Sequence, residues 1–163
     1  MNYIIDKFTA ETQVIINKKA NGTWCALPYP GHKKGCPNFG KKKRCPPNVP
    51  LMKEGATVMM IGVAFDIGRW ASEMKKKHAS WTDRQCRCLL YWQGTLRKEL
   101  RGFLKQAIAA PFTVIYATPE GQGADITAMM KAVGRPLQWP PLTKTWAIVL
   151  LGKPEDRVAR NGK

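Results

Sequence analysis

Long hydrophobic runs are absent from this sequence of 163 residues. The longest apolar stretches, residues 58–65 and 146–151, are far shorter than the roughly 20 residues that a membrane-spanning helix requires. The opening segment MNYIIDKF carries Asp6 and lacks the apolar core of a secretory signal. We therefore expect a cytoplasmic protein that makes no contact with a membrane.

Acidic residues are also scarce. The chain has 11 Asp and Glu against 27 Lys and Arg, which gives a formal net charge of +16 and a pI near 10.0. Hydrophobic residues still make up 44% of the chain, which excludes a disordered polycation. A folded domain with this charge is expected to contact a polyanion.

The apolar pattern predicts a single compact domain over residues 1–163, of the α+β class or, alternatively, α/β. Runs of β-branched and apolar residues predict strands over 12–17, 57–65, 112–117 and 145–151. Helices are predicted over 68–78, 82–107 and 123–133, the second opened by a capping box of Thr82 and Gln85. We thus expect a small mixed sheet, two or three helices and a flexible polar tail over 153–163.

A loop rich in cysteine, proline and glycine occupies residues 24–50, inside a longer stretch that contains no acidic residue. Its proline and glycine content excludes a long helix or a central strand. Three cysteines, Cys25, Cys36 and Cys45, follow the spacing C-x10-C-x8-C. The total of five cysteines is odd and does not describe a disulfide framework. Since a loop of this length is normally functional or disordered, we expect a metal to hold it together.

Two kinds of metal fit these cysteines. Three thiolates can hold a [4Fe–4S] cluster with one iron left open, or His32 can complete a Cys3His zinc site. We favour the cluster, for which Cys86 is a further candidate ligand unless it is an incidental buried thiol. The neighbouring lysines are expected to lower the pKa of the loop thiols and so to favour the thiolate. The remaining alternative is that the loop cysteines are free thiols packed as small hydrophobic side chains.

Two segments of the chain resemble a known family. Residues 36–47, CPNFGKKKRCPP, resemble the cysteine signature of the DUF2284 family, described as predicted metal-binding proteins. Residues 119–127, PEGQGADIT, followed by Gly134, resemble that family's C-terminal pattern. The resemblance implies a small metal protein with cysteine ligands, and it supports Cys36 and Cys45 more directly than Cys25. It implies no particular reaction.

The scarcity of carboxylates limits the candidates for acid–base catalysis. Asp66 follows a predicted strand, and Glu120 and Asp125 lie in a glycine-rich segment. Strand ends do host catalytic residues in open sheets, but helix capping or a surface charge is the other interpretation of each carboxylate. Whether the chain is an enzyme stays open. If it is, the open iron of a three-cysteine cluster would act on a sulfur-containing or nucleotide substrate.

Cations interleave with aromatic residues in the loop and along the predicted helix 82–107. Cations on phosphates and aromatic rings on bases are typical of single-strand or RNA binding, which we favour over duplex binding. The predicted nucleic-acid contacts are Lys33, Lys34, Lys41, Lys42, Lys43, Arg44, Arg84, Arg87, Lys98, Arg101 and Lys105. The alternative is a generic basic surface whose aromatic residues belong to the core. The sequence therefore predicts a metal-binding protein with a basic surface for nucleic acid.

Overall fold

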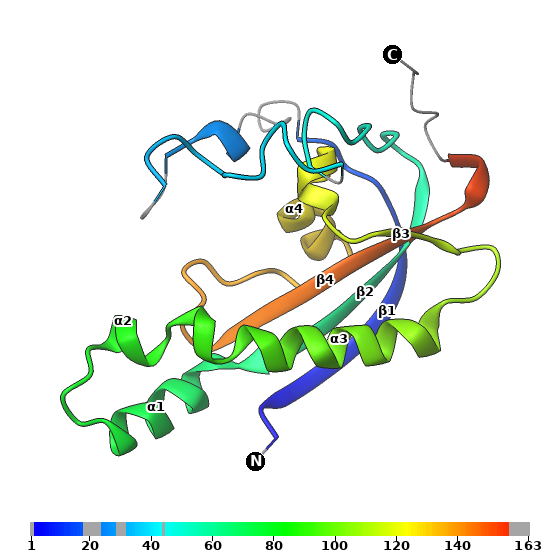
Figure 1. Cartoon of the computed structure of the whole chain (residues 1–163). Helices are drawn as coiled ribbons and strands as arrows, with labels where there is room; N and C mark the ends of the chain where they lie inside the picture. The colour runs from blue at the N-terminus through cyan, green and yellow to red at the C-terminus, as the bar shows by residue number, and fades with distance from the viewer. Residues whose placement is uncertain (1, 18–23, 29–31, 44, 157–163) are drawn as a thin grey trace.

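Four strands form one antiparallel sheet in the computed structural model of the chain, which describes residues 2–17, 24–28, 32–43 and 45–156 (Figure 1). The strand order is β1-β2-β4-β3. The strands are β1 (Ile4–Gln13), β2 (Thr57–Asp66), β3 (Val114–Tyr116) and β4 (Lys144–Gly152). The helices are α1 (Ile67–Lys77), α2 (Asp83–Cys86), α3 (Gln93–Ala107) and α4 (Ile126–Ala132). Short 3₁₀ turns lie at Trp24–Ala26, Leu89–Tyr91, Pro119–Gln122 and Pro154–Asp156.

The α+β class is confirmed, with two differences in detail. Every strand pair is antiparallel, so the sheet is not mixed, and the described residues form four α-helices rather than two or three. The predicted flexible tail begins with an ordered 3₁₀ turn at Pro154–Asp156, and its residues 157–163 lie outside the described part.

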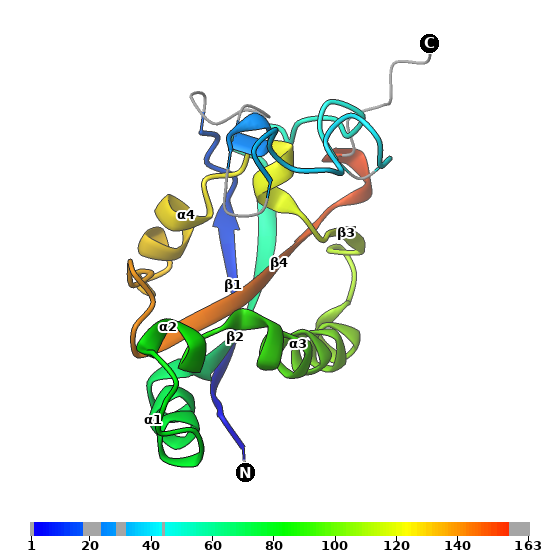
Figure 2. The same ribbon diagram turned by 60° about the vertical axis from the view of Figure 1, so that its left-hand side comes forward.

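Helices cover both faces of the sheet, as Figure 2 shows with α4 on one side and α3 on the other. Central strand β2 is buried on both faces, which explains its continuous apolar sequence. On the α4 side, Met60 and Leu150 pack with Met129 and Met130 of the helix. On the α3 side, Val63 and Phe65 pack against Trp92 and Leu96.

The helix predicted over 82–107 is broken in the structure. It consists of α2, a 3₁₀ turn at Leu89–Tyr91 and α3, with Cys88 in a non-helical conformation (φ −56°, ψ 118°) between the first two. The indole N–H of Trp92 donates to the Arg87 carbonyl (3.1 Å), and the Trp92 ring stacks on Phe65 at 5.2 Å between centroids. Burial of this large ring in the core overrides the local helical pattern.

The first strand also differs from the prediction. The structure places β1 at Ile4–Gln13 and not over 12–17. The apolar run at 14–16 leaves the sheet instead: Val14 is buried, the Ile15 carbonyl accepts the Asp125 N–H (2.7 Å), and Ile16 forms a bridge with Ala124. These contacts tie the segment that follows β1 to the segment that precedes α4.

Candidate functional site

The first two loop cysteines lie on adjacent backbone segments. Cys25 sits in the 3₁₀ turn Trp24–Ala26, and its carbonyl accepts the Cys36 N–H at 2.7 Å. Gly35 permits this approach: its φ is 81°, and a Cβ there would lie 2.7 Å from the Cys25 carbonyl oxygen and from the Ala26 carbonyl group. A residue with a side chain would therefore push the two segments apart.

Cys45 is joined to the same loop by a series of turns. Its N–H donates to the Lys42 carbonyl (3.0 Å), and its own carbonyl accepts the Asn48 N–H (2.9 Å). The neighbouring Pro46 carbonyl accepts the Gly40 N–H (2.8 Å). Backbone hydrogen bonds thus hold the described residues of this proline-rich segment in a defined shape without regular secondary structure.

The three thiols influence one another electrostatically. Partial burial raises the pKa of the Cys25 thiol above its usual value, and the negative charges that Cys36 and Cys45 carry as thiolates raise this pKa further. The expectation that the lysines lower this pKa is therefore wrong for Cys25, because the exposed lysine side chains lie in water while the thiol is partly desolvated. A cation bound among the thiols would relieve this repulsion.

No three His, Cys, Asp or Glu side chains are arranged to hold a metal ion within residues 2–17, 24–28, 32–43 and 45–156. Metal binding by the loop cysteines therefore stays a prediction. His32 is an exposed residue of the same loop, and its carbonyl accepts the Gly35 N–H (3.0 Å). Cys86 is 1% exposed and packs with Ala71 and Met74. Figure 1 places α2, which carries Cys86, at the opposite end of the sheet from the loop.

The two segments that carry the family resemblance lie in contact. The Met52 N–H donates to the Gln122 carbonyl (2.9 Å), and the Gln122 side-chain amide donates to the Pro50 carbonyl (3.2 Å). A Cβ on Gly121 would meet Pro46 at 3.5 Å. The turn Pro119–Gln122 is therefore a support on which the end of the cysteine loop rests.

Two of the three candidate catalytic carboxylates cap helices. One Asp66 oxygen accepts the Arg69 N–H (2.8 Å) at the start of α1, and one Asp125 oxygen accepts the Ala128 N–H (2.9 Å) at the start of α4. These bonds satisfy helix N-termini, so the capping interpretation holds for both residues. Glu120 caps no helix and lines a pocket instead.

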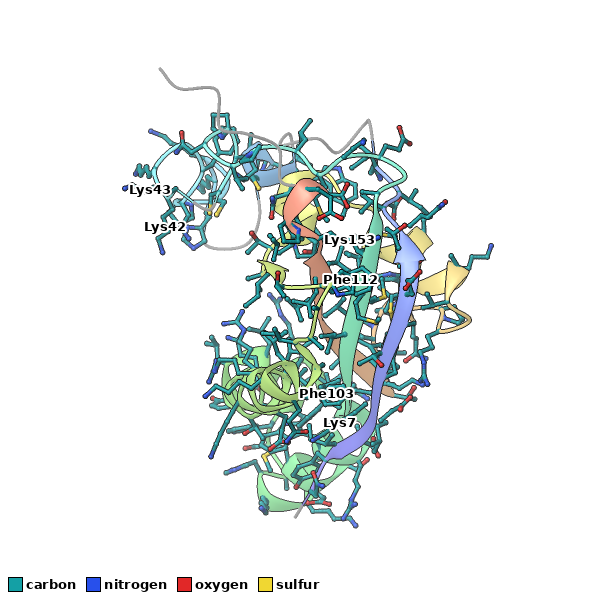
Figure 3. All side chains as sticks on the ribbon, turned by 90° about the vertical axis from the view of Figure 1, so that its right-hand side faces the viewer. Lys7, Lys42, Lys43, Phe103, Phe112 and Lys153 are labelled. Carbon is teal, nitrogen blue, oxygen red and sulfur yellow. The ribbon has the colours of Figure 1, made fainter. Side chains whose placement is uncertain are left out.

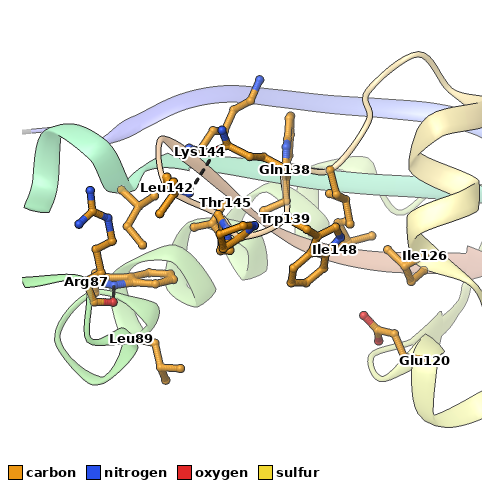
Figure 4. A pocket seen from close by; sticks show the side chains of 16 residues that line it. Arg87, Leu89, Glu120, Ile126, Gln138, Trp139, Leu142, Lys144, Thr145 and Ile148 are labelled. Carbon is orange, nitrogen blue, oxygen red and sulfur yellow. Dashed lines mark hydrogen bonds between the residues drawn. The ribbon is translucent and has the colours of Figure 1, made fainter. Parts of the chain in front are cut away.

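The pocket has a volume of about 470 Å³ and lies between β4, the α2–α3 junction and the chain that connects α4 to β4 (Figure 4). Its lining is mainly apolar and aromatic, including Trp92, Trp139 and Trp146. Glu120 is accessible from the pocket, yet the surrounding protein atoms desolvate its carboxyl and raise its pKa. No motif in the sequence predicts this pocket, and the only signal of it is the cluster of one tryptophan and two prolines at 139–141.

Most of the predicted nucleic-acid contacts are solvated. The described loop lysines and Lys98, Arg101 and Lys105 of α3 are exposed, and no described carboxylate forms an ion pair with them. In Figure 3 the loop and α3 project to the same side of the sheet, opposite α4. Arg84 is exposed on α2, Arg87 is half-buried, and Arg44 lies outside the described residues. Because the predicted helix is broken, Arg84 and Arg87 do not belong to the same helix as the α3 cations.

The exposed aromatic residues of the loop lie among its lysines. Trp24 and Phe39 are both exposed, and the predicted partner Tyr29 lies outside the described residues. Near α2, Trp81 stacks between His78 and Tyr91, with centroid distances of 4.0 and 5.4 Å. The exposed rings of Trp24 and Phe39 beside the loop lysines are suited to stacking with bases, whereas the Trp81 ring already stacks with two neighbours.

No family model, no curated protein and no solved structure matches this chain. The resemblance to the DUF2284 family therefore stays a prediction. No described helix is long and apolar enough to cross a membrane.

Proposed function

We propose that this chain is a small metal-binding protein in which Cys25, Cys36 and Cys45 hold an iron–sulfur cluster or zinc, and whose basic surface contacts nucleic acid. The observation that supports the metal proposal is that the three cysteines lie on one hydrogen-bonded loop, where charges on Cys36 and Cys45 raise the pKa of the Cys25 thiol. Thiolates are the ligands that zinc and iron–sulfur clusters prefer. Free thiols of this kind persist in a reducing compartment, which favours the cytoplasm.

The proposed ligand set leaves one position to be filled. His32 is the candidate within the loop, because it is exposed and lies between Cys25 and Cys36 in the chain. Cys86 is left out, since its thiol is buried in a separate apolar cluster. Closure by His32 would make a structural zinc site, whereas an open fourth position would suit a cluster that binds a substrate.

The test is the metal content and the visible spectrum of protein purified without oxygen. We expect either iron with broad absorption near ~400 nm, as cluster thiolates give, or one zinc per chain in a colourless protein. Cys36→Ser should lose the metal, and Cys88→Ser, a half-buried cysteine outside the loop, should keep it. Folded wild-type protein with neither metal, or equal metal content in both variants, would contradict the proposal.

The nucleic-acid half of the proposal is supported by exposed lysines on one side of the molecule that pair with no described carboxylate. Lys41, Lys42 and Lys43 form an exposed run, and Figure 3 shows Lys42 and Lys43 pointing away from the protein. Phosphate contacts release counterions, so the affinity should fall linearly with salt on logarithmic axes.

We would measure binding of a fluorescent single-stranded RNA across a range of salt concentrations. Changing Lys41, Lys42 and Lys43 to Gln should reduce the slope by about 2, since each phosphate contact to a single strand contributes about 0.7. The matched control changes Lys76, Lys77 and Lys131, also exposed, to Gln and removes the same charge away from the loop. An affinity independent of salt, or equal slopes for the two triple variants, would contradict the nucleic-acid contact.

A second candidate function is an iron–sulfur enzyme with an open iron site. The observation that favours it is that the turn Pro119–Gln122 lies next to both candidate sites. Its Gly121 lies against Pro46 of the cysteine loop, and its Glu120 lines the pocket. Glu120, whose pKa is raised, would then transfer a proton. His32→Ala would distinguish the two: metal content should survive this change in the enzyme and fall in the closed structural site.

A further inference from the structure

The pocket lies along an edge of the sheet that no described strand covers. Strand β4 pairs with β2 over residues 144–151 on one side. On its other side β3 pairs only with residues 150–152, so no described strand covers residues 144–149. Lys144, Trp146 and Ile148 from this half of β4 line the pocket.

Hydrogen bonds hold two of the pocket walls in place. The side-chain oxygen of Gln138 accepts the N–H groups of Leu142 (3.1 Å) and Thr143 (2.9 Å), which closes the segment that carries Trp139 into a compact loop. On the facing wall, the Trp92 indole is fixed by its bond to the Arg87 carbonyl and by stacking on Phe65. Such a site requires little ordering when a ligand enters, which favours binding.

The polar groups of the pocket lie at its two ends. Arg87 and Lys144 are at the end near Leu142, and Glu120 is at the other end beside Ile126 (Figure 4). The Nε of Arg87 is buried and has no hydrogen-bond partner among the described residues. Its guanidinium lies 3.6 Å from the exposed carboxylate of Asp83, a weak contact that leaves donors available for an anion.

We propose that this pocket binds a nucleotide, with the base among the tryptophan side chains and the phosphate at Arg87. Aromatic side chains bind a planar base by stacking, and arginine binds phosphate through its paired donors. The volume of about 470 Å³ lies in the range of small-molecule sites, about 300–1,000 Å³. A purely apolar ligand would leave the unpaired Arg87 donor desolvated.

The nucleotide can come from two sources, a free molecule in solution or one nucleotide of a strand. Only the second source rests on the proposed nucleic-acid function. Trp139 lies at the pocket and is 70% exposed, so its ring is accessible to either source. Its exposure also makes Trp139→Ala a substitution that the fold should tolerate.

The experiment measures binding of adenosine 5′-monophosphate by calorimetry, with ribose 5-phosphate, adenosine and a naphthalenesulfonate as comparison ligands. We expect the monophosphate to bind at least tenfold more tightly than each of the three. Trp139→Ala and Arg87→Met should each weaken it at least tenfold. Leu90→Ala, an exposed apolar residue that does not line the pocket, should leave it unchanged.

A second arm separates the sources by adding a single-stranded RNA and the same strand with abasic positions. If the protein binds the intact strand more tightly than the abasic strand, and Trp139→Ala abolishes this difference in affinity, the result supports a nucleotide that belongs to a strand. Binding of the monophosphate without any strand affinity supports the free nucleotide, although the proposed nucleic-acid function then fails. Salt-dependent strand binding without measurable monophosphate binding overturns the pocket proposal and leaves that function standing. Equal binding of the naphthalenesulfonate and the monophosphate also overturns the pocket proposal.

Discussion

Gly35→Ala tests the metal proposal without touching a thiol. A Cβ at this position would lie 2.7 Å from three backbone atoms of Cys25 and Ala26, whereas ordinary contacts begin near 3.4 Å. The two backbone segments must therefore separate by about 0.7 Å (3.4 minus 2.7). Metal–ligand distances are kept within about 0.2 Å of their ideal values, so the shift is about three times what a site tolerates.

Gly40→Ala is the matched control. Gly40 lies in the same loop with a φ of 71°, close to the 81° of Gly35, but a Cβ there meets nothing within 4 Å. Both substitutions share the cost of a left-handed conformation, about 1–2 kcal/mol. The difference between them isolates the collision with the Cys25–Ala26 backbone.

The assay is zinc affinity, measured by competition with a chromophoric chelator, together with iron content after anaerobic purification. We expect Gly35→Ala to bind zinc at least tenfold more weakly than Gly40→Ala, a difference of about 1.4 kcal/mol. The midpoint of urea unfolding of the metal-free proteins gives the cost of the backbone collision alone, so that its effect on folding is separated from its effect on zinc affinity. Equal zinc affinities of the two variants would refute a site that joins Cys25 to Cys36.

Three further predictions concern stability. Glu120→Gln should stabilise the protein near pH 7, because the raised pKa of Glu120 means that the folded state favours the neutral carboxyl. This gain in the free energy of unfolding should vanish below the ordinary glutamate pKa of about 4.3. Urea titrations that show the same gain at every pH would contradict this explanation. Gly62→Ala should cost about 1–3 kcal/mol in urea unfolding, since its Cβ would overlap the buried Phe8 ring (3.0 Å from Cδ1, nearer to Cε1); a cost below about 0.5 kcal/mol would show that the ring moves freely. Gln122→Ala should cost about 1 kcal/mol by removing the hydrogen bond to Pro50, and an unchanged unfolding midpoint would show that this bond contributes nothing.

The sequence predicts a strand well when the strand's own run of apolar residues matches the residues that are buried in the fold. The continuous apolar run of β2 and the ends of β4 are predicted within a residue or two, because β2 is buried along most of its length and the second half of β4 is buried as well. Strand β1 was missed because it lies at the edge of the sheet, where burial alternates residue by residue. Its alternation places Asp6 on the covered face, where it pairs with Arg135, and that charge obscures the apolar pattern.

The capping box of Thr82 and Gln85 predicts the start of a helix correctly but does not predict where that helix ends. Both of its hydrogen bonds form, yet the helix that they open has only four residues. The chain must turn after Arg87 so that Trp92 can stack on Phe65, a contact between residues 27 positions apart in the sequence. A capping box specifies where a helix starts, but the partner that ends this helix belongs to another element.

The same distinction separates the cysteine loop from the pocket. The loop was predicted because its chemistry is concentrated in one segment, with cysteines, prolines and glycines close in the chain. The pocket draws Arg87, Glu120, Trp139 and Lys144 from four segments, and no one of these residues is unusual in its own segment. Its free strand edge follows from the short β3, which ends at Tyr116 before it can cover the first half of β4. The turn Pro119–Gln122 follows directly, placing Gly121 against the loop and Glu120 in the pocket, so the length of one short strand decides where both candidate sites meet.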